Sequence, residues 1–121
     1  MAYKLDDVQD VDIDEGRFKY ILIKVHHSPE GGAEISKYIV RGYNHCEYHA
    51  DIYDEIAPSI EKNGLDCECV GGGRILHSPQ EKKLEVYGYS QGYGRAEHTI
   101  SVSILKMKYT DYEITYSNDG Y

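Results

Sequence analysis

The stretch "RFKYILIKVHH" (17–27) decides the fold, because it alternates with the period of a strand and is apolar on both faces. Its even positions from Phe18 to Leu22 form one apolar face. Its odd positions from Lys19 to Val25 form a second face that is apolar except for the lysine. The stretch is also rich in β-branched and aromatic residues, which strands favour. It therefore predicts a central strand of a sheet.

Further strands are expected on both sides of this one in the sequence. They cover residues 35–43, 65–76, 82–90 and 112–116. Proline and glycine mark the loop "SPEGGAE" (28–34), and glycine marks the tight loop "QGYGRA" (91–96).

Two helices are expected between these strands. In the first, apolar residues recur every four positions from Tyr48 to Ile60, and Gly64 is a suitable residue to follow its end. Pro58 removes the hydrogen bond to the carbonyl of Asp54, which predicts a kink or an early end. The second helix covers roughly 96–108. Its expected buried residues are Ile100, Ile104 and Leu105.

The order of these elements predicts an α/β (α+β) fold. We expect a single domain over residues 1–121, with a mixed sheet of about five to six strands and two main helices packed on it.

Composition narrows the class of protein. The chain has 121 residues and a net charge of −8, so its overall field repels nucleic acid. No apolar run approaches the roughly 20 residues that a membrane span needs. The first residues show neither a signal peptide nor a transit peptide. We therefore expect a cytoplasmic protein that binds neither nucleic acid nor membrane, whose three cysteines are reduced thiols.

The segment "YNHCEYHADIYDEI" (43–56) allows two interpretations of its histidines. His45 and His49 are four residues apart, and on a helix such a pair can bind zinc. The glutamate of H-E-x-x-H is misplaced, however, and the helical period begins only at Tyr48. A capping box from Asn44 to Glu47 would start the helix earlier and keep the metal interpretation open.

A helix that starts near Glu47 gives His49 another environment, in the first turn. Amides there have no acceptor within the helix, so those of His49 and Ala50 can donate to an anion. The helix dipole disfavours the imidazolium, and a neutral imidazole can act as a base or a nucleophile. A solvent-exposed histidine without a chemical role is the alternative.

The segment "YGYSQGYGRAEH" (87–98) predicts a second half of an anion site. A strand, a glycine-containing loop and a helix follow one another here, which is typical of backbone amide cradles. Gly92 and Gly94 allow close approach of a ligand, and Ser90 adds a hydroxyl donor. Three cations on strands, Lys19, Arg41 and Arg74, are costly to bury unless phosphate or a carboxylate pairs with them.

At these residues the sequence resembles the small phosphohistidine phosphatases, the group that includes the insect Janus and ocnus proteins. The matching segments follow the family order along nearly the whole chain. They are DVDID (10–14), FKY (18–20), IVRGY (39–43), EYHADIYD (47–54), CECVGGGRI (67–75), YGYS (87–90), YGRAEHTIS (93–101) and NDGY (118–121). NHC (44–46) and QGYGR (91–95) depart from the mammalian members.

The resemblance implies a metal-independent enzyme that hydrolyses phosphohistidine on proteins, and we expect a monomer without a cofactor. The resemblance places the essential histidine at His49, acting as general base or nucleophile. The implied phosphate-binding and substrate-binding residues are Lys19, Arg41, Ala50, Arg74, Ser90, Gln91, Gly92 and His98. A weakly active phosphoprotein-binding regulator of the Janus type is the alternative function.

Overall fold

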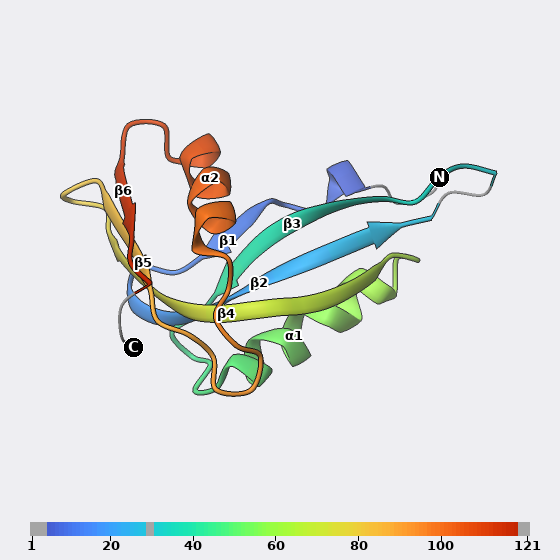
Figure 1. Cartoon of the computed structure of the whole chain (residues 1–121), viewed down its shortest axis with the longest axis horizontal. Coiled ribbons are helices and arrows are strands. Elements are labelled where there is room, and N and C mark those ends of the chain that lie inside the picture. The colour runs from blue at the N-terminus through green and yellow to red at the C-terminus, as the bar shows by residue number, and fades with distance from the viewer. Residues whose placement is uncertain (1–4, 29–30, 119–121) are drawn as a thin grey trace.

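The computed structural model describes residues 5–28 and 31–118 (Figure 1). Positions 29–30 of the expected loop, the first four residues and residues 119–121 of NDGY lie outside the described residues. The elements in chain order are the 3₁₀ helix η1 (Leu5–Asp7), β1 (Val11–Ile13), β2 (Gly16–His27), β3 (Ile35–Gly42), α1 (His49–Glu61), β4 (Asp66–Ser78), β5 (Lys83–Tyr87), α2 (His98–Lys108) and β6 (Glu113–Tyr116).

One mixed sheet carries six strands in the order β1-β3-β2-β4-β5-β6. The strand β2 is central, as predicted, and pairs antiparallel with β3 and β4. The edge strands are the parallel ones, because β1 runs parallel to β3 and β6 runs parallel to β5. The predicted α/β (α+β) class with two helices on a mixed sheet is confirmed.

The two helices lie on opposite sides of the sheet (Figure 1). On the α2 side, Tyr20 and Leu22 of β2 belong to one buried cluster with Val102 and Leu105. On the α1 side, Ile21, Ile23 and Val25 of β2 belong to a second cluster with residues of α1. Burying such a side chain contributes about 1.5–3 kcal/mol, so the double-faced pattern of β2 explains why both faces are covered.

The helix α1 differs from the prediction at both ends. Its first residue is His49, and Tyr48 is an N-cap residue with 61% of its surface exposed rather than a buried member of the apolar stripe. The Asp51 carboxylate accepts a hydrogen bond from the Tyr48 amide at 2.9 Å, so the cap lies later than the alternative Asn44–Glu47 box. The helix also continues past Pro58 to Glu61 rather than ending early.

The helix α2 buries a more polar face than expected. His98, Ser101, Val102 and Leu105 are buried, whereas Ile100 and Ile104 are only partly covered. The strand β1 was not predicted, because three residues give too short a pattern to recognise. Among the described residues, no helix has the length and apolar character that a membrane span requires.

Candidate active site

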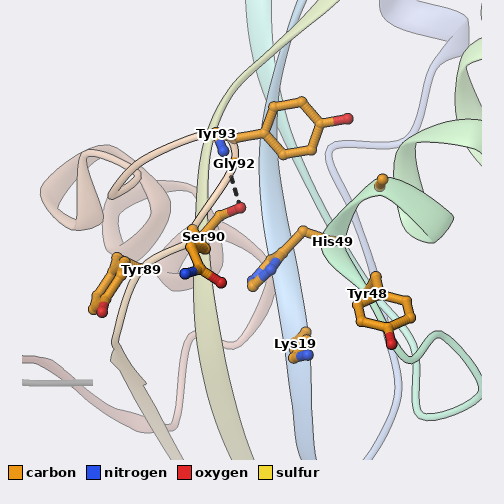
Figure 2. Close-up of a pocket in the computed structure, with 9 residues that line it drawn as sticks. Lys19, Tyr48, His49, Tyr89, Ser90, Gly92 and Tyr93 are labelled. Atoms are coloured by element: carbon orange, nitrogen blue, oxygen red, sulfur yellow. Dashed lines mark hydrogen bonds between the residues drawn. The ribbon is translucent and has the colours of Figure 1, made fainter.

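A cleft of about 660 Å³ lies where the start of α1 faces the loop after β5 (Figure 2). Helix, loop and central strand all contribute to its walls. The residues that line it are Lys19, Tyr48, His49, Ala50, Tyr89, Ser90, Gln91, Gly92 and Tyr93. The predicted histidine and the predicted anion loop therefore meet in one place, although 41 positions separate His49 from Ser90 in the sequence.

His49 is the first residue of α1, and its ring points from the helix toward Ser90 (Figure 2). Only 9% of its surface is exposed. Its Nε2 lies 2.9 Å from the carbonyl oxygen of Gly73 on β4. Because a carbonyl can only accept a hydrogen bond, Nε2 carries the proton, and the neutral ring keeps its lone pair on Nδ1.

The surroundings of His49 favour this neutral form. Burial lowers the pKa of His49 from the ordinary value of 6.5. The hydrogen bond to Gly73 opposes that shift, and the positive charges of Lys19 and Arg74 add to it. The imidazole is therefore mostly unprotonated near pH 7 and available as a base or nucleophile.

The glycine run of β4, from Gly71 to Gly73, makes room for this histidine. A Cβ atom at Gly72 would lie 2.7 Å from Cδ2 of His49 and 3.0 Å from Cβ of Ser90. A Cβ atom at Gly73 would meet His98 Cε1 at 2.8 Å. Consecutive residues of a strand face opposite sides, so the two glycines admit one imidazole to each face of the sheet.

The loop after β5 is closed on itself and fixed to β4. Ser90 and Gly94 exchange backbone hydrogen bonds of 3.1 and 2.8 Å, and the Gly94 carbonyl also accepts from the Gly72 amide at 3.0 Å. The amide of Ser90 is thus occupied within the loop. Within residues 5–28 and 31–118, no hydrogen bond takes up the amides of Gln91 and Gly92.

The Ser90 side chain keeps a proton to donate. Its Oγ accepts the amide of Tyr93 at 3.1 Å, and this bond is drawn in Figure 2. A hydroxyl that accepts one hydrogen bond can still donate another. The cleft therefore offers a hydroxyl from Ser90 and two loop amides on one side, and the amides of His49 and Ala50 at the start of α1 on the other.

Lys19 supplies the positive charge of the cleft. Its Nζ donates to the carbonyl of Glu47 at 2.6 Å and lies 5.4 Å from the centre of the Tyr48 ring. On the neighbouring strand, Arg74 is paired in register with Lys19 and lines an adjoining hollow that shares the lysine. These contacts hold two cations beside the cleft in a chain of net charge −8.

Three of the predicted residues do not line the cleft: Arg74 lines only the adjoining hollow, and Arg41 and His98 lie elsewhere. The Arg41 guanidinium is buried and donates to the carbonyls of Gln9 and Val40 at 2.8 and 3.0 Å. His98 is 1% exposed on the opposite face of the sheet. Its Nε2 donates to the Gly88 carbonyl at 2.9 Å, and its Nδ1 accepts from the Tyr20 hydroxyl at 2.7 Å.

The helical metal pair of His45 and His49 does not form. His45 precedes α1, and its Nε2 lies 2.7 Å from a carboxylate oxygen of Glu55, whereas His49 bonds Gly73. Cys67 and Cys69 of β4 are free thiols and are partly buried against the apolar cluster under α1.

A model of the Janus/Ocnus family matches residues 5–113. The chain belongs to the Janus/Ocnus family. The human 14 kDa phosphohistidine phosphatase is 58% identical over 94% of each chain. The pig protein of the same name is 57% identical over 99% of this chain and 98% of its own. The sex-regulated protein janus-A of Drosophila pseudoobscura pseudoobscura is 55% identical over 92% of this chain and 76% of its own.

Several residues of this Janus/Ocnus site escaped the sequence interpretation. Tyr48, Tyr89 and Tyr93 line the cleft, but the chain has 13 tyrosines, and nothing in their spacing distinguishes these three. The carbonyl of Gly73 orients the histidine, which no side-chain motif can reveal. A signal did exist in the glycine run, because consecutive glycines inside a strand mark close approach of other groups.

Proposed function

We propose that this chain is a protein histidine phosphatase that hydrolyses the P–N bond of phosphohistidine on proteins. One observation carries the proposal. A neutral imidazole, held through Nε2 by the Gly73 carbonyl, stands opposite an amide-rich loop beside Lys19. The similarity to relatives named phosphohistidine phosphatase supports the same activity.

The proposed chemistry uses Nδ1 of His49. In one route, Nδ1 takes a proton from water while the water oxygen attacks phosphorus, and the departing imidazole nitrogen receives a proton in exchange. In the other route, Nδ1 itself attacks phosphorus and the substrate P–N bond breaks as the departing imidazole takes up a proton from solvent. Water then hydrolyses the phosphorylated His49 and returns a proton to solvent. Both routes produce an unmodified histidine residue on the substrate protein and inorganic phosphate, and both place positive charge on a ring that the Gly73 carbonyl stabilises.

The surrounding donors bind the transferring phosphoryl group in this proposal. The amides of Ala50, Gln91 and Gly92, the hydroxyl of Ser90 and the ammonium of Lys19 surround the place where its oxygens would lie. Charge builds up on these oxygens in phosphoryl transfer, and preorganised donors stabilise it without a metal ion. One such donor contributes roughly 2.7–4 kcal/mol to catalysis in comparable sites.

We further propose that the chain is a single domain over residues 1–121 and a cytoplasmic monomer that catalyses without metal or cofactor. Its partners in this proposal are phosphohistidine-containing proteins, and it binds neither nucleic acid nor membrane. The similarity to janus-A, whose name states no activity, favours one second candidate. In that case the cleft binds phosphoprotein and turns over poorly.

The deciding experiment measures phosphate release from a phosphohistidine-containing protein in the presence of EDTA. We expect turnover by the wild-type chain and a loss of roughly 10²–10⁴-fold or more in the His49→Ala variant. The His45→Ala variant is the matched control, because His45 is an exposed histidine outside the cleft. Binding without release would select the regulatory candidate, and equal rates for wild type and His49→Ala would refute the catalytic role.

A further inference from the structure

A second cluster of chemically active side chains lies just before α1, outside the cleft. It contains His45 and Cys46 from the turn and Glu55 from the helix. One donor atom of each residue, a ring nitrogen, a sulfur and a carboxylate oxygen, lies within 4.8 Å of the other two. The His45 Nε2 and a Glu55 carboxylate oxygen are already 2.7 Å apart.

The surrounding chain holds these groups in place. The His45 ring stacks on the ring of Tyr43, with centroids 5.4 Å apart and planes 16° from parallel. The Tyr43 hydroxyl in turn donates to the Asp12 carboxylate at 2.8 Å, and the Cys46 amide donates to the Tyr43 carbonyl at 3.2 Å. The turn that carries His45 and Cys46 is therefore held by its own contacts.

The spacing fits a tetrahedral metal ion. Zinc lies about 2.0–2.3 Å from nitrogen, oxygen and sulfur donors, so the donors of one tetrahedral ion lie about 3.3–3.8 Å apart. The nitrogen of His45 and the oxygen of Glu55 would separate by roughly 0.6–0.9 Å to admit an ion, and the Cys46 sulfur already lies within 4.8 Å of both. Both side chains are largely exposed, so rotation can supply this movement.

Charge and donor type define the class of ion. The Asp14 carboxylate lies against this turn, accepting the Asn44 amide at 2.8 Å, and the whole chain carries −8. Negative charge favours a cation, and a thiolate with an imidazole selects zinc-like ions over magnesium or calcium. We propose that His45, Cys46 and Glu55 bind one Zn²⁺-class divalent cation, with water completing its coordination.

The proposed ion would connect the turn before α1 to the second turn of the helix. It neither touches His49 nor takes part in the phosphatase chemistry proposed above. An ion pair between His45 and Glu55 alone is the simpler interpretation. Exposed pairs of this kind add only about 0–1 kcal/mol, however, and do not explain why a buried thiol adjoins the pair.

The test titrates the full chain with Cd²⁺ in a phosphine reductant and follows the ultraviolet charge-transfer band of a cadmium–thiolate bond. We expect saturation at one Cd²⁺ per chain, displacement by Zn²⁺, and a rise in melting temperature with metal. The Cys46→Ser variant should lose the band. The Glu55→Gln and His45→Ala variants should bind at least about tenfold more weakly.

Matched variants keep the assignment testable. Cys69→Ser removes another partly buried thiol, and Glu61→Gln removes another exposed carboxylate of α1, so both should bind like wild type. Absence of stoichiometric binding, or a band that survives Cys46→Ser and disappears in Cys69→Ser, would overturn the proposal. If Cys46→Ser fails to fold, the exposed position of Glu55 decides, and wild-type affinity in Glu55→Gln would refute the site.

Discussion

Replacing Gly72 by alanine adds only one methyl group, but we expect it to lower the catalytic rate strongly. The added Cβ would lie 2.7 Å from Cδ2 of His49, 2.9 Å from the backbone oxygen of Tyr20 and 3.0 Å from Cβ of Ser90. The Tyr20 oxygen belongs to the central strand and cannot easily move. The crowding must therefore be relieved by the histidine and the serine, which face each other across the cleft.

The structure sets the magnitude of this effect. An ordinary contact begins near 3.4 Å, so the imidazole must yield by about 0.7 Å while its Nε2 remains tied to Gly73. A misplacement of about 1 Å can cost roughly 100-fold in rate. We expect kcat to fall by about 10–100-fold, which corresponds to roughly 1.4–2.7 kcal/mol in activation free energy. Overpacking should also lower the free energy of unfolding by about 1–3 kcal/mol.

The assay combines steady-state phosphate release with denaturant unfolding of the same samples. Gly42→Ala is the matched control, because its Cβ would lie 2.6 Å from the Phe18 ring and 2.8 Å from the Lys19 backbone oxygen. It crowds the same sheet from the α2 side. Both variants should lose stability, and Gly72→Ala alone should show a large loss in kcat at a temperature where both are folded.

Two results would contradict this reasoning. Wild-type kcat in Gly72→Ala would mean that the position of His49 is not critical or that the strand adapts without moving it. An equal loss of kcat in Gly42→Ala would mean that general loosening of the sheet, and not displacement of the histidine, reduces the rate.

Three further predictions concern the pH profile, the loop and the opposite face. Because burial lowers the pKa of His49, kcat/KM should fall on acidification with a midpoint below 6.5, and a midpoint above 6.5 would contradict a neutral His49. Gly92→Pro deletes an amide and should raise the inhibition constant of vanadate more than Gly92→Ala, whose Cβ meets nothing within 4 Å. Tyr20→Phe removes the hydroxyl that bonds His98 and should cost about 1–3 kcal/mol in unfolding free energy, while kcat stays within a few-fold if that network is only structural.

The burial of two histidines also makes the stability of the folded chain depend on pH. Burial is also the main cause that lowers the pKa of His98. The unfolded chain binds protons to both His49 and His98 at a higher pH than the folded chain does. The stability that both neutral rings contribute is therefore complete above about 6.5 and is lost as the pH falls through their lower folded-state pKa values.

The fold was largely predictable because the residue pattern of one strand indicates its place in the sheet. The double-faced pattern of residues 17–27 fixes a central strand, and the two helical patterns then need one face each. Element boundaries differed by only a few residues, except at Pro58. That residue lies on the exposed side of α1, where water can satisfy the Asp54 carbonyl, so the helix continues.

Only part of the site was predictable, because a sequence pattern does not show where a side chain points or which residues of two strands pair. His49 and the loop from Ser90 could be placed at a helix start and after a strand. Nothing in the sequence shows that the Arg41 guanidinium reaches backbone carbonyls, or that His98 belongs to the opposite face. The pairing of β1 with β3 and the face of the sheet that α2 covers decide these two questions, and both depend on residues far apart in the sequence.

The bond from His49 to the Gly73 carbonyl links catalysis to the order of events in folding. The helix can form locally, but its histidine acquires its partner only when β4 has paired with β2. The loop after β5 likewise reaches its final place only by bonding Gly72. Contacts this distant in sequence form late, because the loops that they close carry an entropy cost. A partly folded chain can thus contain every helix and still have no cleft, so enzymatic activity reports completion of the sheet and not merely its beginning.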